Sequence, residues 1–176
     1  MFTNEKITQV AACLLKRAER RLNYTAFLKL LYLADKKMLV EWGIPITYDD
    51  WFSMPQGPVL SHTYNLIRNP QGAWAEHIRT VGYEIELVSS PGDDLLSDAE
   101  ENAIDSIFAE HGEKEWHQLI EYTHSLSEWE DPQGSSIPLS YSQVLEVEGF
   151  PRDRIEQIVK NIKEEKSIQC SLIKEH

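Results

Sequence analysis

The stretch from Phe27 to Ile67 constrains the fold more than any other part of the chain, because it joins unlike segments in a fixed order. A helix with a wide apolar face is followed by a short extended piece rich in aromatic and acidic residues. A Pro-Gln-Gly-Pro break at residues 55–58 then precedes a second, amphipathic helix. A helix with so wide an apolar face is predicted to lie in the centre of the core.

The ends of the central helix are marked in the sequence. Thr25 can cap the N-terminus through its hydroxyl, and Gly43, followed by Pro45, is expected to end the helix. Gly43 and Pro45 are therefore predicted to be structural residues. The second helix of the block is shorter and is expected from about Leu60 to Arg68.

Between the two helices, residues Ile46 to Met54 are predicted to be extended. They are rich in β-branched and aromatic side chains, which favour a pleated, half-buried segment. Pro55 and Pro58, on either side of Gly57, are expected to end this segment. Gly57 and Pro58 are accordingly predicted to be structural.

The fold class predicted for the chain is α+β, a predominantly helical single domain with a small antiparallel β-sheet, because helices do not alternate regularly with strands. With 176 residues, of which 41% are hydrophobic, the chain can bury one core.

The remaining expected elements are a helix over Asn4–Arg21, extended segments His77–Val81 and Tyr83–Val88 around Gly82, a helix from the capping box Ser97–Glu100 to Gly112, and helices over Glu115–Ser125, Ser140–Gly149 and Pro151–Lys166.

The charge and the cysteines limit the partners and the compartment. A formal charge of -12 disfavours direct binding of nucleic acid and would steer a basic protein toward the chain, although solubility alone is the favoured explanation of such a charge. Cys13 and Cys170 suggest neither a disulfide framework nor a zinc site. The chain carries no recognisable signal peptide or apolar run long enough to span a bilayer, so we expect a cytoplasmic protein without a membrane partner.

The histidines and paired carboxylates do not form a recognisable metal site. His117 and His124 are seven positions apart on an expected helix, too far to share a metal ion without other ligands. Asp49 and Asp50 are adjacent on an extended segment, so their side chains should point to opposite faces. One of them is expected to cap a turn or to pair with a lysine. The candidate lysines are Lys36 and Lys37.

No nucleophile or phosphate-binding motif accompanies these residues. Ser53, Ser61 and His62 lack the setting of a nucleophile elbow, and Ser61 can instead bond a free amide at the start of its helix. Gly57 lacks the companion glycines and lysine of a phosphate loop. The sequence therefore predicts no catalytic residue, no metal and no cofactor.

The aromatic residues around the break suggest a recognition surface instead. Trp42 and Phe52 are expected in the core, whereas Tyr48, Trp51 and Met54 are expected at the edge of a shallow, exposed groove. The full set of candidate binding residues is Tyr48, Asp49, Asp50, Trp51, Met54, Gln56 and His62.

Several short motifs resemble the Panacea, or SocA-like, antitoxin domain. They are KLLYLAD at Lys29–Asp35, GxPIT at Gly43–Thr47, MxxGPV at Met54–Val59, and Tyr122-Thr123-His124 followed by Trp129. The resemblance covers most of Lys6 to Ile162, with a longer polar stretch than usual after Trp129. It suggests a domain over residues 1–166 and a polar C-terminal tail over residues 167–176, with no added DNA-binding module.

This resemblance implies a binding protein rather than an enzyme. Members of the family are antitoxins that neutralise varied toxins, including alarmone-synthetase-like ones, by direct binding. A related member delivers its toxin to a AAA+ protease, so such a protease is a second partner that the resemblance allows. Less favoured is a metal-dependent hydrolase that uses Asp49, Asp50, His62 and His124. The sequence identifies neither the toxin nor the oligomeric state.

Overall fold

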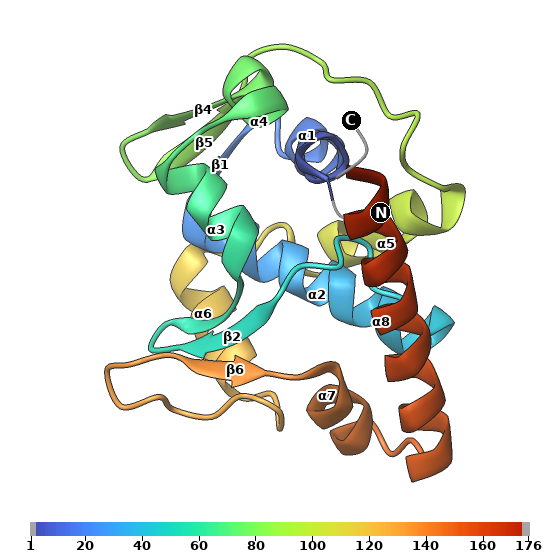
Figure 1. Cartoon of the computed structure of the whole chain (residues 1–176). Coiled ribbons are helices and arrows are strands. Elements are labelled where there is room, and N and C mark those ends of the chain that lie inside the picture. Colours follow the sequence, from blue (N-terminus) through green and yellow to red (C-terminus); the bar gives the residue numbers. More distant parts are fainter. Residues whose placement is uncertain (1–2, 174–176) are drawn as a thin grey trace.

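The structure is a computed structural model that describes residues 3–173, with side chains described as far as residue 168. Helix α2 (Tyr24–Trp42) runs through the centre, and the other elements surround it (Figure 1). The fold class is α+β and predominantly helical, as predicted. None of the helices within residues 3–173 is long and apolar enough to cross a membrane.

The remaining elements follow the chain in a simple order. The other helices are α1 (Asn4–Arg17), α3 (Ser61–Arg68), α4 (Gly72–His77), α5 (Asp98–His111), α6 (Trp116–His124), α7 (Tyr141–Val147) and α8 (Arg152–Ile173). The strands are β1 (Arg21–Asn23), β2 (Trp51–Met54), β3 (Gly57–Leu60), β4 (Ile78–Val81), β5 (Glu84–Leu87) and β6 (Ile137–Leu139).

Helix α2 begins two residues earlier than predicted. Asn23, not Thr25, is the N-cap, and its side-chain oxygen accepts hydrogen bonds from the backbone amides of Thr25 and Ala26. Gly43 ends the helix as expected, in the left-handed conformation with φ of 73°. Side chains around the helix are buried from Ala26 to Asp35, which fits its central place.

Two small antiparallel sheets each join a hairpin to a distant strand. One has the order β1-β5-β4 and the other the order β3-β2-β6. The prediction of one helix over Asn4–Arg21 was wrong: α1 ends at Arg17, because Glu19 and Arg20 have positive φ and β1 then pairs with β5. Strand pairing with a distant segment has overridden the local helical pattern.

The Pro-Gln-Gly-Pro break is the turn of a hairpin. Gly57 and Pro58 do not end an extended segment, as predicted, but begin β3, which pairs with β2. Because β3 lies at the edge of its sheet, Pro58 can occupy it without an amide hydrogen. The extended segment itself is shorter than Ile46–Met54, since Tyr48 adopts a φ of 55°.

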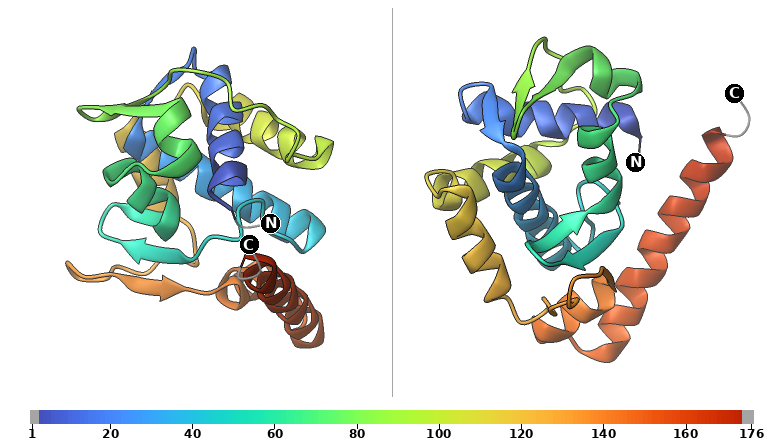
Figure 2. Two further views of the ribbon diagram at one scale, coloured as in Figure 1. Left: turned by 45° about the horizontal axis from the view of Figure 1, so that its top comes forward. Right: turned by 90° about the vertical axis from the view of Figure 1, so that its left-hand side faces the viewer.

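The C-terminal helix is longer than predicted. Helix α8 continues past Lys166 to Ile173, so residues 167–173 are helical rather than an irregular tail. The division of the chain at residue 166 remains a prediction. Ile155, Ile158 and Ile162 of α8 are buried, and Ile158 approaches Gly43 at the end of α2. Figure 2 shows α8 extending along the outside of the molecule, away from the central helix.

Candidate partner-binding site

The carboxylate of Asp35 links α2 to the segment that leads into β2. It is fully buried and accepts hydrogen bonds from the amide and hydroxyl of Thr47, at 2.8 and 2.7 Å, and from the Trp51 indole, at 3.0 Å. Burial raises the pKa of Asp35 to about 6, and the hydrogen bonds oppose that increase. The KLLYLAD and GxPIT motifs therefore meet through one carboxylate.

Asp49 caps helix α3. Its carboxylate accepts hydrogen bonds from the backbone amides of His62 and Thr63, at 2.9 and 2.8 Å, and from the Thr63 hydroxyl, at 2.8 Å. Burial raises the pKa of the Asp49 carboxyl, while these hydrogen bonds act in the opposite direction. Asp49 is thus the aspartate that was expected to cap a turn. Its carboxylate, rather than the Ser61 hydroxyl, accepts the hydrogen bonds from the first free amides of α3.

Lys29 lies beneath the turn between β2 and β3. Its ammonium group donates to the Pro58 carbonyl at 2.9 Å, and burial lowers the pKa of the side chain to about 7. A Cβ on Gly57 would lie 2.7 Å from the Thr123 hydroxyl and 3.2 Å from the Lys29 nitrogen. Gly57 therefore has to be glycine for two reasons: its φ is +97° and the space beside it is filled.

The motif that ends at Trp129 also contacts the turn between β2 and β3. The Trp129 indole donates to the Met54 carbonyl at 3.2 Å, and the His124 ring stacks on Trp129 with centroids 3.9 Å apart. Tyr32 donates to the buried Glu128 at 2.8 Å. The polar motif residues of the antitoxin-like resemblance thus contact one another and stabilise the framework.

Several predicted site residues are buried instead of exposed. Tyr48 and Trp51 are in the core, and the Trp51 ring lies between Tyr32 and Tyr141, with centroid distances of 5.1 and 4.7 Å. The prediction of an exposed aromatic groove edge was wrong for both: Trp51 lies on the central strand of its sheet and faces α2, and Tyr48, which precedes β2, is only 7% exposed. Met54 is half-buried.

Trp42, in contrast, is more exposed than predicted. It was expected in the core, but its side chain is 63% exposed because it is the last residue of α2 and lies beyond the covered part of the helix. Phe52, also expected in the core, is half-buried and packs against it.

Asp50 points away from Asp49, as predicted, but its lysine partner is different. Its exposed carboxylate lies 3.0 Å from the Lys166 ammonium on α8. The proposed pairing with Lys36 or Lys37 was wrong. Lys36 binds Glu128 and Glu148, and Lys37 binds Glu41. No local pattern could have indicated Lys166, which is 116 positions from Asp50.

The candidate residues lie at two ends of β2, beside different cavities. A groove of about 390 Å³ between β2, β6 and α8 is lined by Asp49, Asp50 and Trp51. A second cavity, of about 300 Å³, lies under the β2–β3 turn and is lined by Met54 and Gln56. The half-buried His62 belongs to neither lining, and its Nε2 lies 2.7 Å from the Asn4 side-chain oxygen.

The residues of the hydrolase alternative do not converge. Asp49 binds the amides of α3, Asp50 faces α8, and the His124 ring stacks on Trp129. Within the described part of the chain, no group of three or more His, Cys, Asp or Glu side chains could hold a metal ion. What the arrangement offers is a rigid hairpin with cavities beside it, a geometry suited to contact with another molecule.

Comparison with known proteins assigns the framework to a family. Residues 27–130 match the family described as antitoxin SocA-like, Panacea domain. The chain belongs to this family. No curated protein and no solved structure matches the chain.

The SocA-like match includes the KLLYLAD, GxPIT and MxxGPV motifs and the motif that ends at Trp129. It extends from Phe27 in α2 to Glu130, just beyond α6, a shorter span than Lys6 to Ile162. Helix α1 and the segments from β6 to α8 lie outside it. The groove beside Asp50 is therefore built partly from residues of the family domain and partly from residues beyond it.

Proposed function

We propose that this SocA-like protein is an antitoxin that neutralises one cognate toxin by direct protein–protein binding. The match of residues 27–130 to an antitoxin domain is the observation that supports it. The polar motif residues fit this role because they stabilise the framework and leave recognition to the surface. A toxin of the alarmone-synthetase type is the class that the resemblance suggests.

The proposed interface includes the accessible members of the candidate set. Asp50 and Gln56 are exposed, and Met54 and His62 are half-buried. A stable complex of standard size needs roughly 1,200–2,000 Å² of buried surface, so these residues would form only part of it. The neighbouring cavities supply further area for contact.

The test is to express the chain with the protein encoded beside it. We expect that expression of the chain restores growth to cells poisoned by that protein, and that the purified pair forms a tight one-to-one complex by calorimetry. Failure of the purified proteins to bind would refute the proposal.

Toxin levels in the same cells distinguish direct sequestration from delivery of the toxin to a protease. Direct sequestration leaves the amount of toxin unchanged when a AAA+ protease is deleted. A toxin level that falls only in the presence of the protease would show that the chain is an adaptor.

A further inference from the structure

Two cavities on the α3 side of the molecule adjoin each other at a pair of tyrosines. The first, of about 780 Å³, lies between α3 and the β4–β5 hairpin, and the second is the cavity under the β2–β3 turn. Tyr24 and Tyr64 line both. We call the two together the tyrosine trough. Figures 1 and 2 show that α3, the β4–β5 hairpin and the β2–β3 turn lie along one side of the molecule.

The charge of the tyrosine trough is opposite to that of the whole chain. Among the described residues, Arg68 and Arg79 line the first cavity, the buried Lys29 lines the second, and neither lining includes an Asp or Glu, although Glu86 binds Arg79. The chain as a whole has 29 acidic residues against 17 basic ones. The groove beside Asp50, in contrast, is lined by carboxylates as well as lysines. Because Lys29 is buried and Arg79 is paired with Glu86, Arg68 is the exposed cation of the lining that has no carboxylate partner among the described side chains, and it favours a negatively charged group there.

Arg68 is the cation best placed to meet that ligand. It is exposed, its guanidinium lies 5.7 Å from the centroid of the Tyr64 ring, and no carboxylate among the described side chains lies within ion-pair distance of it. Arg79, in contrast, already binds Glu86 at 2.7 Å. An arginine supported by an aromatic ring can bind an incoming carboxylate through two parallel hydrogen bonds.

The rim of the tyrosine trough is apolar. On the β4–β5 hairpin and just beyond it, Val81, Tyr83 and Val88 have 42%, 74% and 43% of their surface exposed. The Tyr83 ring lies 6.2 Å from that of Tyr24. Tyrosine and arginine are the residue types that contribute most to binding at protein interfaces. Their combination here indicates a protein ligand rather than a small anion.

We propose that the tyrosine trough binds an acidic, apolar segment of a partner protein, with a carboxylate on Arg68 and apolar side chains against Tyr64 and Tyr83. The partner is the toxin, and to that extent the inference rests on the proposed function.

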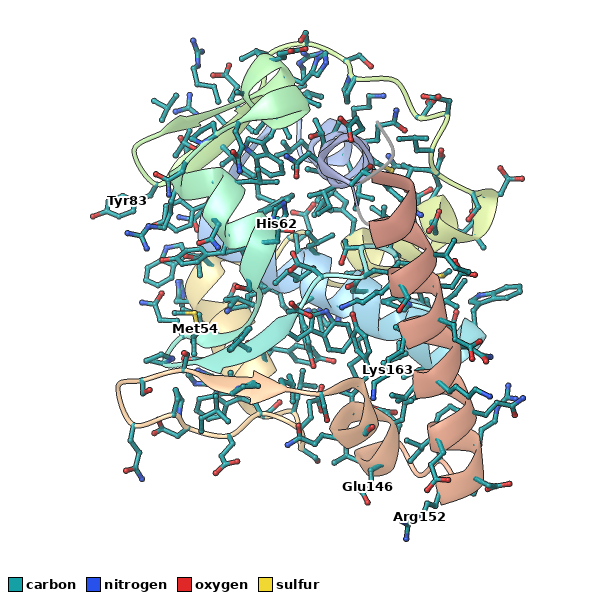
Figure 3. The ribbon with its side chains drawn as sticks, viewed as in Figure 1. Met54, His62, Tyr83, Glu146, Arg152 and Lys163 are labelled. Atoms are coloured by element: carbon teal, nitrogen blue, oxygen red, sulfur yellow. The ribbon has the colours of Figure 1, made fainter. Side chains whose placement is uncertain are left out.

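The first experiment is calorimetric titration of the full chain with the toxin, comparing Arg68→Glu with a matched charge reversal, Arg152→Glu. Arg152 has a 92% exposed side chain on α8, and Figure 3 shows it on the opposite side of the molecule from Tyr83 and Met54. We expect Arg68→Glu to weaken binding at least ~30-fold and Arg68→Ala about tenfold. Arg152→Glu should change the affinity less than about twofold, as expected for a charge outside the interface.

The outcomes separate this inference from the proposed function. If wild type and Arg68→Glu bind and neutralise the toxin equally, the inference is wrong and the antitoxin function stands. If wild type does not bind the toxin, the antitoxin function is wrong, and the second experiment decides whether the tyrosine trough has the proposed specificity. Circular dichroism of the variants checks that each remains folded.

The second experiment uses a short synthetic peptide in which Glu alternates with Leu and Tyr, followed by NMR of the labelled full chain. We expect shifts at the Tyr64 and Thr80 amides and at the Arg68 side chain, all lost in Arg68→Glu. A peptide with Lys in place of Glu, and oligouridylate as a nucleic-acid probe, should not cause them. The same shifts with either control, or their persistence in Arg68→Glu, would overturn the proposal.

Discussion

The family domain and the C-terminal region are held in place by different interactions. In the domain, buried polar groups such as Asp35, Asp49 and Lys29 bind partners across helices and turns. The C-terminal region joins it through the backbone pairing of β6 with β2 and through buried isoleucines of α8. Unpaired buried polar groups destabilise a fold strongly, so the first arrangement specifies one geometry. The second combines strand pairing and apolar contact with a few polar contacts, such as the hydrogen bond from the Tyr141 hydroxyl to the Asp49 carbonyl at 2.7 Å, and its apolar positions tolerate more variation.

The largest effect should come from Asp35→Ala, within the family domain. The Thr47 amide and the Trp51 indole would lose their acceptor, and we expect a loss of about 4 kcal/mol in the free energy of unfolding. Urea denaturation measures it. Asp153→Ala, at an exposed position in the first turn of α8, is the control and should cost less than about 0.5 kcal/mol. A loss below about 1 kcal/mol for Asp35→Ala would contradict the role of this carboxylate.

The effect of Asp35→Ala on the free energy of unfolding should depend on pH. Burial raises the pKa of Asp35 from 3.8 to about 6, so between these values the folded state binds more protons than the unfolded state. The stability that the folded protein gains from protonation of Asp35 is complete below pH 3.8 and is lost as the pH rises through 6. The difference in stability between wild type and Asp35→Ala should therefore be larger at pH 5 than at pH 7.5.

A second large effect is expected at Gly57. The Cβ in Gly57→Ala would clash with Thr123 at a residue whose φ is already +97°, and we expect a loss of about 3 kcal/mol in thermal or urea unfolding. Gly134→Ala separates strain from crowding, because Gly134 also has a positive φ but no atom within 4 Å of its Cβ position. It should cost only about 1 kcal/mol. Equal losses at the two glycines would show that crowding at Gly57 does not matter.

The C-terminal region is tested by a pair of variants on α8. Ile162→Ala removes buried apolar contacts and should cost about 2.5 kcal/mol in urea unfolding. Lys166→Ala removes the ion pair with the exposed Asp50 and should cost less than about 0.5 kcal/mol. If the lysine variant proves the more damaging, α8 is attached by charge and the contrast with the family domain is wrong.

The remaining prediction is a pH dependence of stability that arises from Lys29. Burial lowers its pKa from 10.5 to about 7, so between these values the unfolded state binds the extra proton. The penalty for burying this group therefore disappears as the pH rises, and wild type should gain about 2 kcal/mol relative to Lys29→Met between pH 7 and pH 9. Urea denaturation at both pH values measures the change. If the stabilities of wild type and Lys29→Met changed equally between pH 7 and pH 9, the pKa of Lys29 would be the ordinary one.

Local signals predicted much of the framework correctly. The capping box of Ser97 and Glu100, the helix stop at Gly43 and the divergence of Asp49 from Asp50 all appear in the structure. Each depends on residues within a few positions of one another. The antitoxin-like motifs likewise indicated the family, which the match of residues 27–130 then showed.

The tertiary structure alone decided which of these residues reach the surface. Strands β1 and β6 pair with strands far along the chain, so three-residue segments too short for a clear pattern became part of sheets. The same pairing buried Trp51. The tyrosine trough likewise joins α3, two hairpins and the start of α2. Sequence by itself determined most of the helices, the capping box of α5 and the family, because these depend on short-range order. Burial and surface charge depend on long-range contacts, which no local pattern encodes.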